Sequence, residues 1–132
     1  MRHPSLDIWE EKLKKVLDEL DDFLEDKFGE EYDLHPVRTH RGKTANKAQD
    51  GLFDIVASFS MGAGSQYGKG YVVDVHIATL DQVPEKIQRE IEGITLRKLR
   101  ATLPKYFPGK NLNVDKDGNI IKIHGDLSLG TL

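Results

Sequence analysis

The stretch from Gly51 to Thr79 constrains the fold more than any other part of this sequence. It contains two apolar segments, residues 52–60 and 70–78, which are separated by a glycine-rich connection. Short segments rich in valine, isoleucine and phenylalanine and bounded by glycine are typical of β-strands. The stretch therefore predicts a long antiparallel hairpin, and the rest of the chain must supply the layer that covers it.

The register of this hairpin determines which side chains lie together. A turn centred on Ser65 places Asp54 opposite His76, and it places Asp74 opposite Val56. Because successive side chains in a strand point to opposite faces, Asp54, Asp74 and His76 then share one face of the sheet. The apolar alternate positions face the core: Phe53, Ile55, Ala57, Phe59, Tyr71, Val73, Val75 and Ile77.

Two helices are predicted to flank the hairpin in sequence. Residues 5–28 carry apolar side chains at spacings of three and four, with Ser5 as the N-cap and Gly29 after the end. The apolar positions are Leu6, Trp9, Leu13, Val16, Leu17, Leu20, Phe23, Leu24 and Phe28. A second helix is expected to begin at Asp81–Pro84 and to stop at Pro104 and Gly109.

Three further strands complete the predicted fold. A short edge strand is expected around Tyr32–Arg38, and residues 112–115 and 120–124 form a second hairpin around Lys116–Asn119. The sequence predicts one α+β domain over residues 1–132, a two-layer sandwich with both helices on one face of a mostly antiparallel sheet. The predicted order is α-β-β-β-α-β-β. The step from Ile77 to Val114 is expected to introduce a parallel or mixed element.

Composition excludes several kinds of site. The chain of 132 residues has no cysteine, so disulfides, thiolate zinc sites and a cysteine nucleophile are all excluded. Its charged first thirty residues do not resemble a secretory signal, and its apolar runs are far shorter than the ~20 residues of a membrane span. A cytoplasmic protein without a membrane partner is expected.

The charges are distributed unevenly along the chain. Residues 1–34 carry 12 acids and 5 bases, whereas residues 35–132 carry 10 acids and 14 bases. The bases include a loop with Arg38, His40, Arg41 and Lys43, which predicts an anion-binding site for a phosphate-bearing ligand or nucleic acid. The acids of the first helix are expected to form a solvated face; the functional alternative is a basic surface that receives a phosphate-bearing ligand, with the acidic helix kept away from it.

The glycine-rich connection does not match a phosphate-binding loop. Ala63 stands where the first glycine of a P-loop belongs, and Gly70 replaces its hydroxyl residue. The connection is therefore interpreted as a flap of the hairpin, with Ser65, Gln66 and Tyr67 at its tip.

The shared hairpin face suggests metal chemistry. Two carboxylates and an imidazole, from Asp54, Asp74 and His76, suit a divalent cation such as Mg²⁺, Mn²⁺ or Zn²⁺. The element order, with Asp54 in one strand and Asp74-Val75-His76 in the next, resembles the core of the PD-(D/E)XK metal-dependent nucleases over residues 5 to about 115. That resemblance implies metal binding by Asp54 and Asp74. It places His76 where the family has a lysine, Asp74 where glutamate is more usual, and Phe53 where the family has a proline.

Two classes of function follow from these features. The first and favoured class is a small binding or interaction domain that uses the basic loop and the open sheet face, on which Val56, Val72 and Ala78 could also form a homodimer contact. The second is a metal-dependent hydrolase of nucleic acid that uses Asp54, Asp74 and His76.

Overall fold

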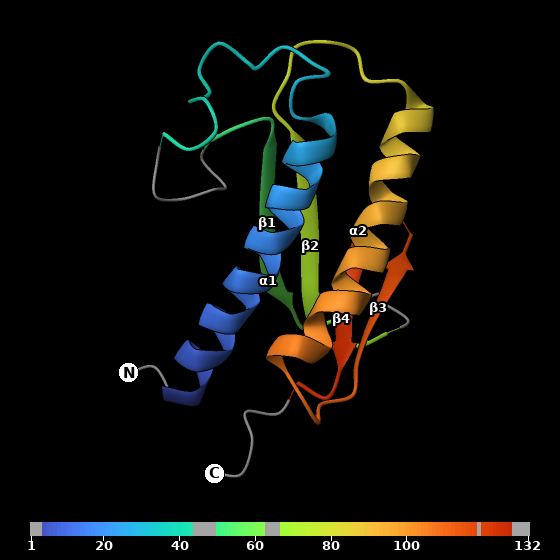
Figure 1. The fold of residues 1–132 in the computed structure, drawn as a ribbon. Helices are drawn as coiled ribbons and strands as arrows, with labels where there is room; N and C mark the ends of the chain where they lie inside the picture. Colours follow the sequence, from blue (N-terminus) through green and yellow to red (C-terminus); the bar gives the residue numbers. More distant parts are fainter. Residues whose placement is uncertain (1–3, 44–49, 63–66, 119, 128–132) are drawn as a thin grey trace.

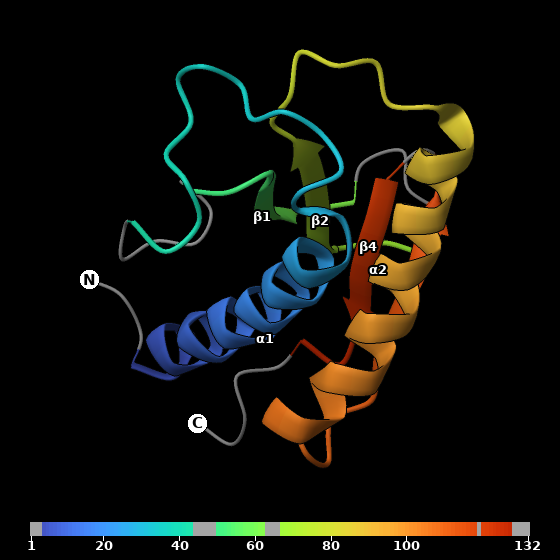
Figure 2. The ribbon, with the colours of Figure 1, turned by 45° about the horizontal axis from the view of Figure 1, so that its top comes forward.

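The structure, a computed structural model, describes residues 4–43, 50–62, 67–118 and 120–127. Helix α1 (Pro4–Phe28) is followed by strands β1 (Phe53–Ser60) and β2 (Gly70–Ile77), then by α2 (Glu85–Tyr106), β3 (Leu112–Asp117) and β4 (Ile120–Gly125). Both helices lie on the same face of one four-stranded sheet (Figures 1 and 2). The predicted α+β two-layer architecture is confirmed.

The order of strands in the sheet is β1-β2-β4-β3, and all three neighbouring pairs are antiparallel. The predicted parallel element is therefore wrong. Strands β2 and β3, which α2 connects, run in the same direction, but β4 is inserted between them. The last strand of the chain thus lies inside the sheet.

The predicted strand around Tyr32–Arg38 is not formed, so the order of elements is α-β-β-α-β-β. Pro36 has no N–H to donate to a ladder, and the segment is joined to the end of β2 through the bond from His35 N to Ala78 O at 2.8 Å. An isolated bridge between Thr39 and Asp50 is the β-pairing that this connection makes in the described residues.

Helix α1 contributes one apolar face to the core, as its spacing predicts. Its side chains at Trp9, Leu13, Val16, Leu20, Leu24 and Phe28 are all at most 5% exposed. Phe23 is 42% exposed and lies outside this face, under the ammonium of Lys98. The helix begins at Pro4, one residue earlier than predicted.

Helix α2 covers the other half of the sheet and ends later than predicted. Pro104 lies inside its last turn, and Phe107 N donates to Leu103 O at 2.9 Å to close the end. A proline near a helix end removes only one backbone bond, so the helix continues to Tyr106. No helix in the described part of the chain has the length and apolar character needed to cross a membrane.

Candidate functional site

The β1–β2 hairpin has the register that the sequence predicts. Asp54 pairs with His76, and Asp74 pairs with Val56. The side chains of Asp74 and His76 are exposed, and that of Asp54 is half-buried. In the described ranges, however, no three histidine, aspartate or glutamate residues form a group that could hold a metal ion. Asp54 and Asp74 occupy diagonal positions, where Cβ atoms are about 7–8 Å apart and short side chains directed to solvent do not converge.

We therefore expect Mg²⁺ and Mn²⁺ to leave the thermal unfolding midpoint of the protein unchanged. A cation that binds the native state raises the midpoint as its concentration exceeds the dissociation constant. The measurement is thermal unfolding by circular dichroism at increasing metal concentration, for the parent and for Asp74→Ala. A rise in the parent that Asp74→Ala abolishes would contradict this expectation and would establish the predicted metal site.

Arg38, the first cation of the predicted anion-binding loop, makes its contacts inside the protein. Its Nε donates to the carbonyl of Gly51 at 3.1 Å, and its Nη2 donates to the carbonyls of Asp50 at 2.8 Å and Phe53 at 3.0 Å. The half-buried guanidinium thus joins the loop to the beginning of β1. It stabilises the polypeptide where the chain enters the sheet.

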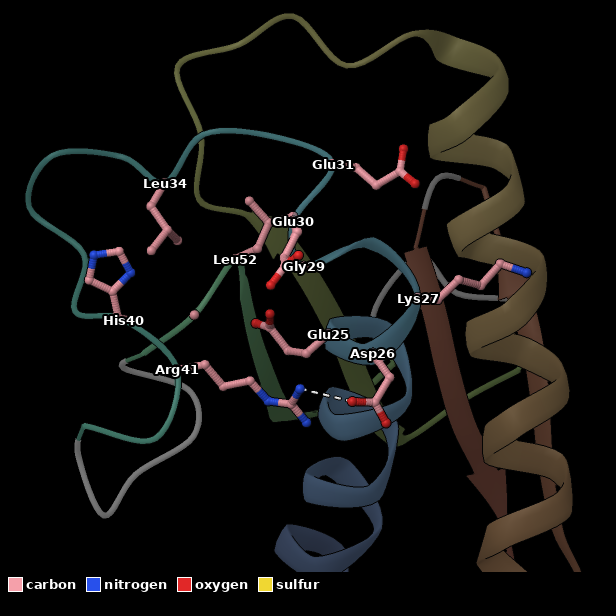
Figure 3. A pocket seen from close by; sticks show the side chains of 11 residues that line it. Glu25, Asp26, Lys27, Gly29, Glu30, Glu31, Leu34, His40, Arg41 and Leu52 are labelled. Atoms are coloured by element: carbon pink, nitrogen blue, oxygen red, sulfur yellow. Dashed lines mark hydrogen bonds and ion pairs between the residues drawn. The ribbon is translucent and has the colours of Figure 1, made fainter.

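Arg41, the second arginine of the loop, pairs with α1. Its Nη1 lies 2.8 Å from Asp26 Oδ1, and its Nη2 lies 3.2 Å from Asp22 Oδ1. Figure 3 shows the Arg41 side chain extended from the loop toward the helix. The alternative in which the acidic helix is kept away from the basic residues is therefore wrong for Arg41, which pairs with two carboxylates of α1. His40 and Lys43 are exposed, and anion binding by them stays a prediction.

A cavity of about 730 Å³ lies between the C-terminal end of α1 and this loop. Glu25 lines this cavity, is drawn above the end of the Arg41 side chain in Figure 3, and has 6% of its surface exposed. Its Oε1 accepts the N–H of Phe53 at 2.9 Å. Burial raises the pKa of the Glu25 carboxyl, and it outweighs the opposing effects of the Phe53 N–H and of Arg41. Glu25 accepts the N–H of Phe53, and Arg38 donates to its C=O. The two side chains therefore stabilise the start of β1.

The described end of the hairpin connection, at Tyr67 and Gly68, contacts the open face of the sheet, the face opposite the helices. The Tyr67 ring stacks on the His124 ring at 4.5 Å with an interplanar angle of 24°. The Lys122 side chain is 1% exposed, and its ammonium donates to the carbonyl of Gly68. Of the predicted flap tip, Tyr67 therefore lies against β4, whereas Ser65 and Gln66 fall outside the described residues.

Beside Tyr67, three polar side chains form a linked set of contacts that the sequence pattern does not predict. His124 Nε2 is 2.8 Å from Asp115 Oδ2, and Asp115 Oδ1 is 3.2 Å from Arg100 Nη2. Arg100 also donates twice to the carbonyl of Val114. The register of the predicted second hairpin would have placed Asp115 and His124 on one face. The contribution of Arg100 from α2 depends on tertiary packing.

A second hollow follows from a mismatch in strand length. Strand β2 runs to Ile77, but its pairing with β4 ends at Val73–Ile121. Beyond that pair, a groove of about 1020 Å³ lies beside β2 where β4 would otherwise continue. Gln88, Ile91 and Thr95 of α2 line the groove, together with residues of β2, the ends of β3 and β4 that lie next to each other, and the connection after β2.

The backbone of β2 directs unused hydrogen-bonding groups into this groove. Ala78 N donates to Leu52 O at 2.7 Å, so the backbone N–H of Ala78 points toward β1. Because the backbone groups of successive strand residues alternate in direction, those of Val75 and Ile77 point away from β1. The carbonyl of Ile77 accepts from Thr79 N at 2.9 Å. The N–H and C=O of Val75 and the N–H of Ile77 face the groove without a backbone partner in the part of the chain that the structure describes. The groove, called the β2 groove below, is thus bounded by an open strand edge.

Comparison with known proteins places this chain among relatives. An uncharacterized protein of Borreliella burgdorferi is 41% identical over 107 residues, which cover 81% of this chain and 84% of the relative. No solved structure matches the chain with significance. A family described as "Uncharacterised protein" has a model that matches residues 4–125. On both grounds, this chain belongs to that family.

Proposed function

We propose that the protein is a small binding domain that takes a segment of a partner protein into the β2 groove. The observation that carries the proposal is the edge of β2, where three backbone groups have no backbone partner among the described residues, beside a groove of about 1020 Å³. Binding sites are concave, with an apolar lining and a few placed polar groups. Here Ile77, Val83 and Ile91 supply the apolar lining.

The β2 groove supports a binding function better than the basic loop does. Two of the three arginine and lysine side chains described in that loop, Arg38 and Arg41, contact carbonyls and carboxylates of the same chain. A phosphate-bearing ligand would have to compete with these contacts. The backbone groups of Val75 and Ile77 that face the groove have no such contacts among the described residues. The hydrolase alternative needs three converging ligands, and in the described ranges Asp54, Asp74 and His76 do not converge.

The test is selection from a displayed library of random dodecapeptides, followed by affinity measurement on variants. Gln88 is exposed on α2 and lines the groove, so Gln88→Trp places a large ring in it. Lys86→Trp is the matched control, because Lys86 is exposed on the same helix outside the groove. We expect selected peptides to bind the parent and Lys86→Trp equally and to lose at least about tenfold in affinity on Gln88→Trp.

Two results would overturn the proposal. The first is a selection that enriches no peptide on the parent. The second is a set of peptides that bind Gln88→Trp as tightly as the parent, because their site would then lie elsewhere. Urea unfolding of both tryptophan variants checks that each retains the parent fold.

A further inference from the structure

We infer that the β2 groove receives its partner as an added β-strand and selects a basic side chain next to Asp74. This inference rests on the proposed function and specifies the class of segment that is bound. It combines two observations, the direction of the free backbone groups of β2 and the balance of charge around them.

The backbone determines the conformation of the bound segment. The N–H and C=O of Val75 and the N–H of Ile77 lie along one edge, at alternate residues of an extended strand. Donors and acceptors spaced in this way are matched by another extended backbone, which is the basis of recognition by strand addition. Strand β4 begins at Ile120, and its pairing with β2 stops at Val73–Ile121, so the added strand extends the line of β4 along β2.

The two faces of the sheet determine the pattern of side chains in the segment. On the helix side, an added strand faces the side chains of Val75, Ile77 and Ile91, of which Ile91 is 4% exposed. On the open side, it faces Asp74 and His76. Because successive side chains of a strand alternate between faces, the segment alternates apolar and polar residues.

The charges of the groove determine the sign of the polar residue. Glu85 pairs with Arg89 at 2.6 Å, and Glu92 pairs with Lys116 at 3.2 Å. Asp74 has no ion-pair partner within the described ranges. It is exposed on the open face beside the free edge.

A fourth carboxylate of the groove, that of Asp81, accepts the N–H of Asp33 at 2.8 Å. Counting its acidic residues and its lysine and arginine, the groove carries four carboxylates and two cations. A lysine or arginine next to Asp74 balances this excess, whereas an acidic residue adds to it.

The test uses three capped heptapeptides with this alternation. The first is acetyl-TVKVKVT-amide, the second replaces both lysines with glutamate, and the third carries N-methyl groups on the three valine amides. Binding is followed by nuclear magnetic resonance of the ¹⁵N-labelled protein. We expect the lysine peptide to shift the amide signals of Val75 and Ile77 and the N-methylated peptide to lose binding. Asp74→Asn is expected to lower the affinity for the lysine peptide about threefold to fivefold. The control variant Asp7→Asn, which changes an exposed carboxylate on α1, is expected to leave that affinity unchanged.

Each contrary outcome has its own meaning. If the N-methylated peptide binds as well as the first, strand addition is wrong. If the lysine and glutamate peptides bind equally, selection by Asp74 is wrong. In both cases, library peptides that lose affinity on Gln88→Trp would leave the proposed groove function standing. If light scattering shows that the parent dimerises and Gln88→Trp does not, the occupant is a second copy of the chain, and the inference is overturned.

Discussion

Replacing Arg38 with methionine is expected to lower the free energy of unfolding by about 2–4 kcal/mol, whereas Arg41→Met is expected to lower it by at most about 1 kcal/mol. Arg38 donates to three backbone carbonyls from a half-buried position, and methionine would leave all three without that donor. Arg41 pairs with Asp22 and Asp26 at the surface, where its own side chain is 43% exposed. Two arginines of one loop therefore differ in their effect because they differ in burial.

Urea unfolding of both variants in low and high salt makes this comparison. The contribution of Arg41 should fall as salt screens the exposed pairs, and that of Arg38 should persist. Arg38→Lys is the conservative control, and it should recover only part of the loss because an ammonium cannot match the planar fork of a guanidinium. Equal losses for Arg38→Met and Arg41→Met would show that the carbonyl contacts do not hold the loop.

Replacing Glu25 with alanine is expected to lower the free energy of unfolding by about 2–4 kcal/mol. The side chain is 6% exposed, and its Oε1 is the acceptor for the N–H of Phe53. Alanine would leave a buried donor unpaired and open a cavity between α1 and β1. Glu25→Gln keeps an oxygen acceptor for the Phe53 N–H, so its loss should be much smaller. Equal losses for the two variants would contradict this account.

The raised pKa of Glu25 gives this position a dependence on pH of known sign. Because burial raises the pKa in the folded state above the ordinary value of 4.5, the folded state keeps the proton longer than the unfolded state does. The stability due to the protonated form is present below the unfolded pKa and is lost as pH rises through the folded pKa. Urea unfolding at pH 4 and pH 7 should therefore show Glu25→Gln gaining stability relative to the parent as pH rises. A difference that does not change with pH would contradict the raised pKa.

The local pattern of the sequence predicts the elements of the fold well and their assembly less well. Alternation in residues 52–78 determines the register of β1 and β2, since a slip by one residue would place Phe53 and Val73 in solvent. Apolar side chains at spacings of three and four identify α1 and α2, because that spacing places them on one buried face of a helix. The position of β4 between β2 and β3 has no comparable local signal, because it depends on which strand edges meet after the helices pack. The strand predicted near Pro36 does not form, which also shows that a local pattern does not determine whether a segment pairs with the sheet.

The candidate site was harder to predict than the fold. Asp54, Asp74 and His76 do share a face, but the direction in which each side chain leaves that face decides whether three ligands converge. The sequence places the basic residues in one loop, whereas the partners of Arg38 and Arg41, the carbonyls near Gly51 and the α1 carboxylates, cannot be read from that loop. The β2 groove depends on where β4 ends relative to β2. Such an offset between strands depends on tertiary packing, so no sequence motif predicts it.

The central position of β4 has a consequence for how the chain is made. Gly70 of β2 pairs with His124 of β4, so the sheet joins the middle of the chain to its end. During synthesis, the β1–β2 hairpin can form early from local contacts, but β2 and β3 have no shared neighbour until residues 120–125 leave the ribosome. A nascent chain cut short before Ile120 lacks a middle strand and exposes two strand edges at once, which makes residues 120–125 decisive for a folded product.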